Sequence, residues 1–268
     1  RLARALQAAR AAGKPVLAMK VGASEAGARA AATHTGALAG ADRVFDAVLR
    51  DSGAVRLDSL SALVEAAYVA SIGPMPTGRR LMVITTSGGI GVLAADVAEG
   101  RGLALPPIGD AALADLRAIA PLADGRNPVD TSAGILGDLS AYARMAARAL
   151  ADTPVDAVLC FVAHITRNPA HWAQLREPLL ALRGAHRDKA FALSGLADAS
   201  ITAELESQGI AVFADPGAAV AALAACAPRE AAPTSAALEG EGPAASPLPR
   251  GPMSERAAKA VLIGQGLC

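Results

Sequence analysis

Short apolar segments alternate with helix-like segments along most of the sequence, and this alternation limits the fold more than any other feature. Between residues 79 and 227, five segments read as strands: RLMVITT, LAL, DAVLCFVA, KAFALS and IAVF. A segment with apolar side chains at helical spacing follows each of them. Parallel strands need such helical crossovers. The pattern therefore predicts an α/β fold with a flavodoxin-like, doubly wound parallel sheet over residues 79–227.

The remaining residues form shorter blocks. Residues 1–72 show a βαβα pattern with a first strand in KPVLAMKVG, which predicts part of a second domain of the same kind. Residues 228–252 are rich in Pro, Ala, Gly and Ser and read as a linker. Residues 253–268 read as one helix capped by Ser254. Both ends look cut, so we expect the sequence to be part of a longer protein.

The composition excludes several classes of protein. Hydrophobic residues make up 53% of the sequence, which excludes a disordered chain. With 25 basic and 25 acidic residues, the net charge gives no broad surface for nucleic acid. No apolar run reaches the roughly 18 residues of a membrane span. Cys160, Cys226 and Cys268 lie far apart, so we expect no metal site, a reducing compartment and a cytoplasmic location.

A glycine-rich turn follows the first strand of the 79–227 block. It contains Ser87, Gly88, Gly89, Ile90 and Gly91, and a helix begins among the glycines. Backbone N–H groups at a helix start can bind an anion, and glycine lets that anion approach the backbone closely. The pattern lacks the full GxGxxG spacing and the lysine of a P-loop. A tight turn without a ligand explains it equally well.

His34 lies in ATHTGALAG, a stretch with almost no large side chains. Neutral imidazole is a good nucleophile near pH 7, because its free pKa is about 6.5. The small neighbours leave room for a bulky anionic group, Thr35 offers a hydroxyl, and Gly36 leads to a helix expected to start near residue 41. The alternative is a loop histidine that local hydrogen bonds satisfy.

Two other positions could contact a ligand. Pro128 makes Asn127 extended, so the loop NPVD could present Asn127 and Asp130 to a substrate or a neighbouring domain. Turn chemistry alone explains these residues as well. His164 follows a strand at the edge where doubly wound folds bind ligands, although an exposed loop histidine is the simpler interpretation.

Several stretches together resemble the NDP-forming acyl-CoA synthetases, a family that includes ADP-forming acetate–CoA ligases and is related to succinyl-CoA synthetase. They are KPVLAMKVGASEAGARAAATHTGALAG, DRVFDAVLRDSGAVRLDSLSALVEAA, TTSGGIGVLAADVAEGRGL, GRNPVD and SERAAKAVLIGQGL. The resemblance assigns residues 1–72 to the C-terminal part of a first ligase-CoA domain and residues 79–227 to a second one. Residues 253–268 would begin an ATP-grasp domain.

The resemblance implies an acid–CoA ligase that works through a phosphorylated His34. Acyl-CoA and phosphate would give an acyl phosphate and CoA, the acyl phosphate would phosphorylate His34, and the phosphohistidine would make ATP or GTP from the diphosphate. Thr35, Gly36 and the turn Ser87–Gly91 would bind the phosphate. CoA, the nucleotide and Mg²⁺ would bind mainly to domains outside this sequence, which alone would be inactive. We expect an oligomer, a carboxylic acid as substrate, and no nucleic acid or membrane as partner.

Two other classes of function stay open. One is the synthetase-like regulatory portion of a protein lysine acetyltransferase, although such proteins usually lack the phosphorylated histidine. The other is a non-catalytic flavodoxin-like interaction module. The sequence does not choose between acyl groups or between ADP and GDP.

Overall fold

A computed structural model describes residues 2–35, 42–123, 125–228, 254, 256–257 and 259–260. Residues 1–229 form one compact unit and residues 230–268 a second, and the fold described below is that of the first. The expected linker at 228–252 lies almost wholly outside the described residues. Of the expected helix at 253–268, residues 256–257 and 259–260 are described as helical. None of the helices that the structure describes combines the length and apolar character that crossing a bilayer requires.

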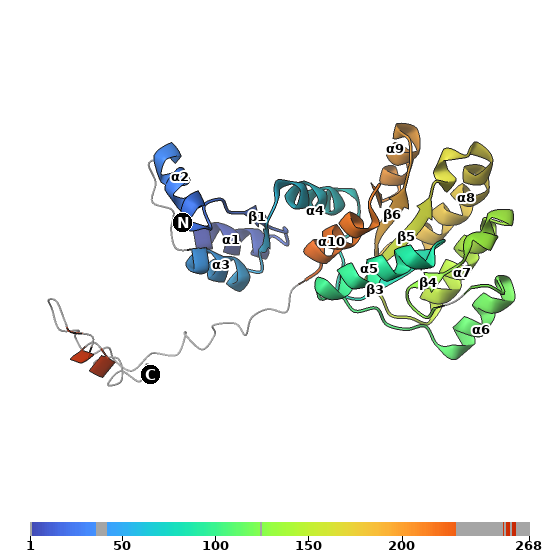
Figure 1. The fold of residues 1–268 in the computed structure, drawn as a ribbon, viewed down its shortest axis with the longest axis horizontal. Helices are drawn as coiled ribbons and strands as arrows, with labels where there is room; N and C mark the ends of the chain where they lie inside the picture. The colour runs from blue at the N-terminus through green and yellow to red at the C-terminus, as the bar shows by residue number, and fades with distance from the viewer. Residues whose placement is uncertain are drawn as a thin grey trace. The chain divides into compact units, whose positions relative to one another are not determined.

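The larger sheet of the first unit has five parallel strands, on the right-hand side of Figure 1. Its strands are β3 (Leu81–Thr85), β4 (Val129–Asp130), β5 (Ala157–Ala163), β6 (Ala190–Gly195) and β7 (Ile210–Phe213). They lie in the order β4-β3-β5-β6-β7, and every neighbouring pair is parallel. Numbered from its first strand, this is the order 2-1-3-4-5 of flavodoxin-like folds. The expected fold class is confirmed.

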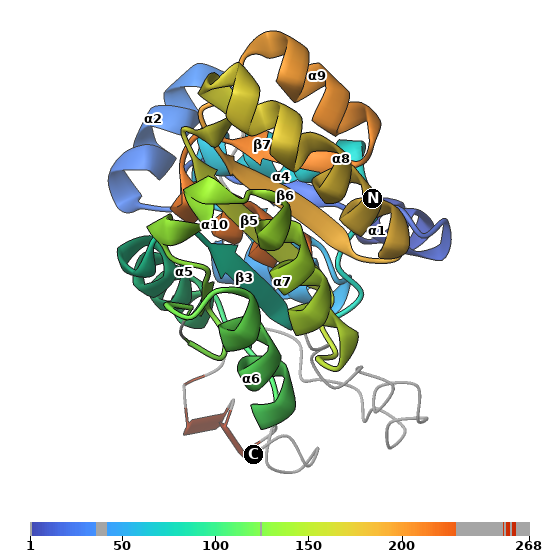
Figure 2. The same cartoon turned by 90° about the vertical axis from the view of Figure 1, so that its right-hand side faces the viewer.

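Helices cover both faces of this sheet. Side chains of β3 alternate between the faces, with Met82 and Ile84 in one hydrophobic cluster and Leu81 and Val83 in the other. The first cluster contains residues of α6 (Asp110–Ile119), α7 (Ser140–Ala151), α8 (Pro169–Ala185) and α9 (Ala199–Ser207). The second contains residues of α4 (Leu60–Ile72), α5 (Gly88–Gly100) and α10 (Pro216–Cys226). Figure 2 shows α7 and α8 in front of the strands.

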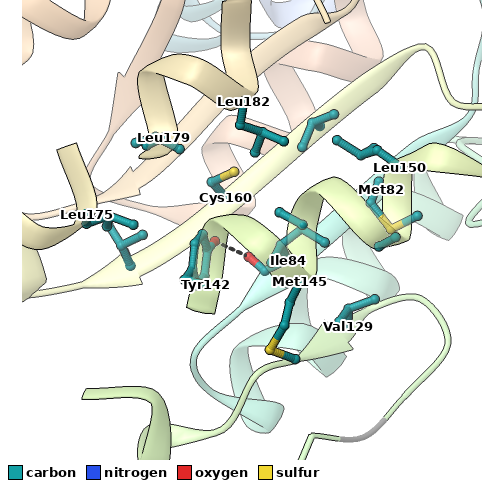
Figure 3. Packing of buried hydrophobic residues seen from close by; sticks show 14 of the residues in the cluster. Met82, Ile84, Val129, Tyr142, Met145, Leu150, Cys160, Leu175, Leu179 and Leu182 are labelled. Atoms are coloured by element: carbon teal, nitrogen blue, oxygen red, sulfur yellow. Dashed lines mark hydrogen bonds between the residues drawn. The ribbon is translucent and has the colours of Figure 1, made fainter. Parts of the chain in front are cut away.

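Tyr142 of α7 anchors the first cluster. Its ring is fully buried, and its hydroxyl donates a hydrogen bond of 2.9 Å to the carbonyl of Ile84 (Figure 3). Burial raises the pKa of the neighbouring Cys160 thiol to about 12, so this cysteine stays protonated and packs as a small apolar residue.

The N-terminal segment forms a small parallel pair of strands. Its elements are α1 (Leu2–Ala11), β1 (Leu17–Met19), α2 (Glu25–Thr35), α3 (Asp42–Asp51) and β2 (Val55–Leu57). Leu57 lies in the same hydrophobic cluster as α4 and α10, which joins this segment to the larger sheet. We keep the division into domains at residues 73–78 as a proposal, because residues 1–229 form one compact unit.

Helix α4 buries a face that only partly matches the one that apolar spacing predicts. That spacing selects Leu60, Leu63, Val64 and Ala67. Leu63 is partly buried against the second cluster, yet Leu60 is 62% exposed and Val64 59% exposed. Ala66 and Val69 are buried instead. Apolar residues lie on every side of α4, so their period does not choose a face. Small side chains allow close packing against the alanine-rich α10, and this tertiary contact decides the orientation.

The second strand position of the sheet also differs from the prediction. Leu103–Leu105, expected as a strand, pairs with the sheet only through the single bridge Arg80–Ala104. The strand is β4, in a segment expected to be a polar loop. After the bridge at Ala104, the chain leaves the edge of β3 to form α6 and returns to this edge at Asn127. The side chain of Asn127 bonds to the backbone groups of β3 that no neighbouring strand reaches. Its Oδ1 accepts from Val83 N at 3.1 Å, and its Nδ2 donates to the carbonyls of Leu81 at 2.8 Å and Pro106 at 3.0 Å.

Tyr68 of α4 forms a hydrogen bond with the backbone of the edge strand β7. Its hydroxyl accepts from Val212 N at 2.8 Å and donates to Glu206 at 2.6 Å, and its ring contacts Phe213 edge-on. Because Tyr68→Phe keeps the ring but leaves this strand N–H without its partner, we expect it to lower the free energy of unfolding by about 1–2 kcal/mol. Urea titration measures this loss. An unchanged midpoint would mean that the hydroxyl contributes nothing.

Candidate functional site

The candidate site lies where β3, β4 and β5 end. Strand β3 has β4 on one side and β5 on the other. The connection after β3 therefore leads to one edge of the sheet and the connection after β4 leads back toward the other edge. In doubly wound sheets, ligands bind outside the carboxyl ends of the strands at such a reversal. Helix α5 begins at Gly88, three residues beyond the last residue of β3. The predicted glycine turn therefore lies at the expected position for a ligand.

The N-terminus of α5 has backbone donors without a side-chain cap. Ser87 is the N-cap residue, and its side chain makes no capping hydrogen bond. Its own N–H donates instead to the hydroxyl of Thr85 at 3.0 Å. Helices α8, α9 and α10 are capped by Asn168, Asp198 and Asp215, whereas α6 and α7, like α5, have no side-chain cap. The first-turn N–H groups of α5, including that of the exposed Gly89, are thus suited to an external anion.

The glycines of this turn have different roles. Gly91 is buried, and a Cβ there would lie 3.1 Å from Cβ of Pro128 and 3.2 Å from Cγ2 of Thr85. Packing therefore explains Gly91. A Cβ on the exposed Gly89 would meet nothing within 4 Å, so packing does not require glycine there. An anion that approaches the backbone would require it.

Asp130 lies beside the start of α5. Its Oδ1 accepts from Ser132 N at 2.8 Å, and its Oδ2 lies 2.8 Å from the position that a Cβ on Gly88 would occupy. The structure thus brings Asp130 to the glycine turn, whereas the amide of Asn127 is used on the sheet. A carboxylate beside an anion site weakens anion binding by repulsion.

Two strained residues flank the site, and the sequence does not reveal them. Ser132 follows β4 with φ 60° and ψ 160°, and Ala163 ends β5 with φ 49°. Each such conformation costs on the order of 1–3 kcal/mol in a residue other than glycine, and such strain clusters at functional sites. Gly195 allows the close approach, since a Cβ there would lie 2.7 Å from the carbonyl oxygen of Ala163.

His34 lies in a helix, which corrects the expectation of a small-residue loop. It is in the last turn of α2, and the alanine-rich sequence favours this helix. The hydroxyl of Thr33 donates to the carbonyl of Ala30 at 2.8 Å and is therefore used within α2. The side chains of His34 and Thr35, and all of Gly36, lie outside the described residues.

The next helix, α3, already carries an acidic side chain at its start. Asp42 bonds to Arg56 at 2.9 Å and to Lys20 at 3.3 Å. The hydrogen bond from Arg56 is the main reason that the pKa of Asp42 lies below its ordinary value. Further along the chain, His164 is exposed at the end of β5. Within the described residues, no group of three or more His, Cys, Asp or Glu could hold a metal ion.

Known proteins resemble this chain in sequence and in fold. Residues 1–70 match the family model described as succinyl-CoA ligase like flavodoxin domain. Subunit alpha of the ADP-forming acetate–CoA ligase II of Pyrococcus furiosus is 39% identical over 147 residues, which cover 54% of this chain and 32% of that protein. The ADP-forming 4-hydroxybutyrate–CoA ligase of Nitrosopumilus maritimus is 37% identical over 125 residues, 47% of this chain and 17% of that protein.

A solved structure has the same fold. It is a dinucleotide-forming acetyl-coenzyme A synthetase 1 of Ca. Korarchaeum cryptofilum in complex with phosphate and ADP, with a TM-score of 0.67 and 26% identity over 80% of this chain and 46% of that chain. This chain spans a third or less of the two curated relatives, at 32% and 17% of their lengths. The resemblance seen in the sequence is confirmed: residues 1–70 match the succinyl-CoA ligase like flavodoxin domain, and the chain is similar to ADP-forming acetate–CoA ligases and to a solved acetyl-coenzyme A synthetase.

Proposed function

We propose that this chain is part of an acid–CoA ligase that works through a phosphohistidine at His34. The enzyme interconverts acyl-CoA, phosphate and ADP or GDP with a carboxylic acid, CoA and ATP or GTP. The single observation that carries the proposal is the uncapped N-terminus of α5 at the switch point of the sheet, with the exposed Gly89 in its first turn. The relatives reported above are named as ligases or a synthetase, which favours this function over an acetyltransferase portion or an interaction module.

The anion site supplies what the chemistry needs. A phosphate oxygen attacks the thioester carbonyl, the C–S bond breaks, and the thiolate of CoA takes a proton. The imidazole of His34 then attacks phosphorus, an N–P bond forms, and the carboxylate of the acid leaves. The phosphoryl group carries a charge near −2, and the N-terminus of α5 provides roughly +0.5 together with hydrogen-bond donors. Splitting one difficult transfer into two steps is the benefit of covalent catalysis.

Helix α2 is weakly packed, which supports the proposal that His34 moves between two sites. None of its side chains from Glu25 to Thr33 is buried. An isolated helix of its length, 11 residues, is marginal in water. A phosphate on His34 would also face the negative end of the helix dipole, which loosens the last turn. We infer that α2 releases phosphorylated His34 so that it can reach a nucleotide site.

Domains and location follow the same proposal. Residues 1–72 and 79–227 are the two ligase-CoA segments, 228–252 is the linker, and 253–268 begins the ATP-grasp domain. We place CoA, the nucleotide and its Mg²⁺ mainly outside this chain, which spans 32% and 17% of the two curated relatives. Free buried thiols at Cys160 and Cys226 fit a reducing cytoplasm. An oligomeric enzyme remains part of this proposal.

Gly89→Ala in the complete enzyme tests the anion site. Alanine favours the helix and meets no protein atom, so we expect stability to be kept or raised by up to about 1 kcal/mol. The methyl group obstructs the anion, so we expect kcat/KM for phosphate to fall about tenfold, as for the loss of about 1.4 kcal/mol. Thermal unfolding and the rate of CoA release from acyl-CoA measure the two effects.

Gly100→Ala is the matched control, because it changes the last residue of the same helix and also meets no atom within 4 Å. We expect it to leave kcat/KM unchanged. If both variants were equally active, the N-terminus of α5 would not bind the phosphate.

A further inference from the structure

An apolar cavity of about 290 Å³ opens beside the candidate site. It lies between the end of α6 with the loop after it and the 3₁₀ helix η1 (Ala133–Gly137), and we call it the α6–η1 cavity. Most of its lining is apolar; the residues used below are Ile119, Leu122, Ser132, Gly134, Ile135 and Ala141. Its volume is just below the range for sites of drug-sized molecules, about 300–1,000 Å³, so it suits a smaller group.

The mouth of the cavity exposes apolar surface. Leu122 is 76% exposed and lies in the turn after α6. A Cβ on Gly134 would lie 3.9 Å from Cδ1 of Leu122, so the two residues face each other. The one charged residue of the lining, Asp138, is already bonded to Arg144 at 3.2 Å and to Ser140. Such a site favours an apolar group over an ion.

The cavity borders the candidate anion site at Ser132. Ser132 lines the cavity, and its N–H donates to Asp130 Oδ1 at 2.8 Å. The other oxygen of Asp130 lies against Gly88 at the start of α5. Asp130 and Ser132 are two residues apart, a span of at most about 7 Å. A single small molecule can therefore place a polar end near α5 and an apolar end in the cavity.

Ser132 lies at the boundary between the two parts, and its backbone is strained. Its φ of 60° and ψ of 160° belong to a region that is essentially reserved for glycine. Its hydroxyl accepts from Gly134 N at 3.2 Å and so fixes η1, the wall of the cavity. A strained residue persists only where its surroundings impose the conformation, and here the conformation shapes the boundary between an anion site and an apolar one.

We propose that the α6–η1 cavity binds the apolar part of the carboxylic acid whose acyl group is transferred. The inference rests on the proposed function and names the substrate class: acids with an aliphatic chain of several carbons or with one aromatic ring. Acetate leaves the cavity unfilled. Leu122, Gly134 and Ile135 are then specificity-determining residues.

Substrate preference in the complete enzyme tests the assignment. With acetate, hexanoate and phenylacetate as substrates, we compare the wild type with Gly134→Phe, which obstructs the mouth, and Leu122→Ala, which removes apolar surface. One methylene in an apolar pocket changes specificity by about 10-fold or more. We expect Gly134→Phe to lower kcat/KM about tenfold or more for the two larger acids, and Leu122→Ala to lower it a few-fold. Acetate should be unaffected.

Leu60→Ala is the control, since Leu60 is also an exposed leucine and lies on α4. It should change none of the three values. Equal losses for all three acids in the cavity variants, or no loss at all, would overturn the proposal.

A binding measurement separates this proposal from the proposed function. Hexanoate is added to the 268-residue chain, and the methyl NMR signals of Ile119, Leu122 and Ile135 are followed. We expect these signals to shift in the wild type and to stay in place in Gly134→Phe. Shifts confined to other methyl groups would overturn the assignment. If these methyl groups shift but the complete wild-type enzyme forms no acyl-CoA from ATP, CoA and any acid, the cavity assignment stands and the ligase function fails.

Discussion

The Asn127→Ala protein is expected to unfold with a free energy about 3–5 kcal/mol below that of the wild type. The substitution removes the partner of the buried Val83 N–H and the donor to the carbonyls of Leu81 and Pro106. Each buried polar group left without a partner costs about 1–3 kcal/mol. Denaturant titration of the chain measures the loss.

Asn168→Ala is the reference variant, with which the loss of unfolding free energy in Asn127→Ala is compared. Asn168 caps α8 through Ala170 N at 3.0 Å, so its loss should cost about 1 kcal/mol. If Asn127→Ala cost no more than this cap, the side chain of Asn127 would not complete the sheet.

The His34→Asn enzyme is expected to lose ATP formation by at least about 10⁴-fold, because asparagine cannot form the N–P bond. The first half of the reaction should persist, since the attack of phosphate on acyl-CoA does not use the imidazole. Release of CoA and appearance of acyl phosphate, measured beside ATP formation, separate the two steps.

His164→Asn is the matched substitution, because His164 is an exposed histidine that follows β5 at the carboxyl edge of the sheet. It should keep both half-reactions. If only the His164→Asn enzyme lost ATP formation, the assignment of the phosphohistidine to His34 would be wrong.

The sequence predicts most of the sheet but not its second strand. Strands β3, β5, β6 and β7 are apolar runs followed by helices with clear spacing, and these signals are local. Strand β4 has two residues, Val129 and Asp130, in a segment of polar residues and proline. It is a strand because the side chain of Asn127 replaces a peptide group at the edge of β3. No local pattern contains that contact.

The sequence likewise predicts some features of the candidate site and not others. The glycine turn at the start of α5 follows from a strand, glycines and a helix in succession, and the sequence places it correctly. The conformations of Ser132 and Ala163 depend on how distant segments pack, and neither residue is a glycine that would mark them. The helical conformation of α2 could have been predicted, because alanine is frequent there and Glu25 stands in its first turn. The α6–η1 cavity arises from packing between helices and has no sequence signal.

Mass-spectrometric mapping after incubation with ATP and Mg²⁺ tests the central claim most directly. The complete protein is digested at high pH, where a phosphoramidate survives, and the site of the acid-labile phosphate is located. The account predicts one such phosphate, on the peptide that contains His34, and its disappearance when CoA and a carboxylic acid are added. A phosphate on any other residue, or none at all, would contradict it.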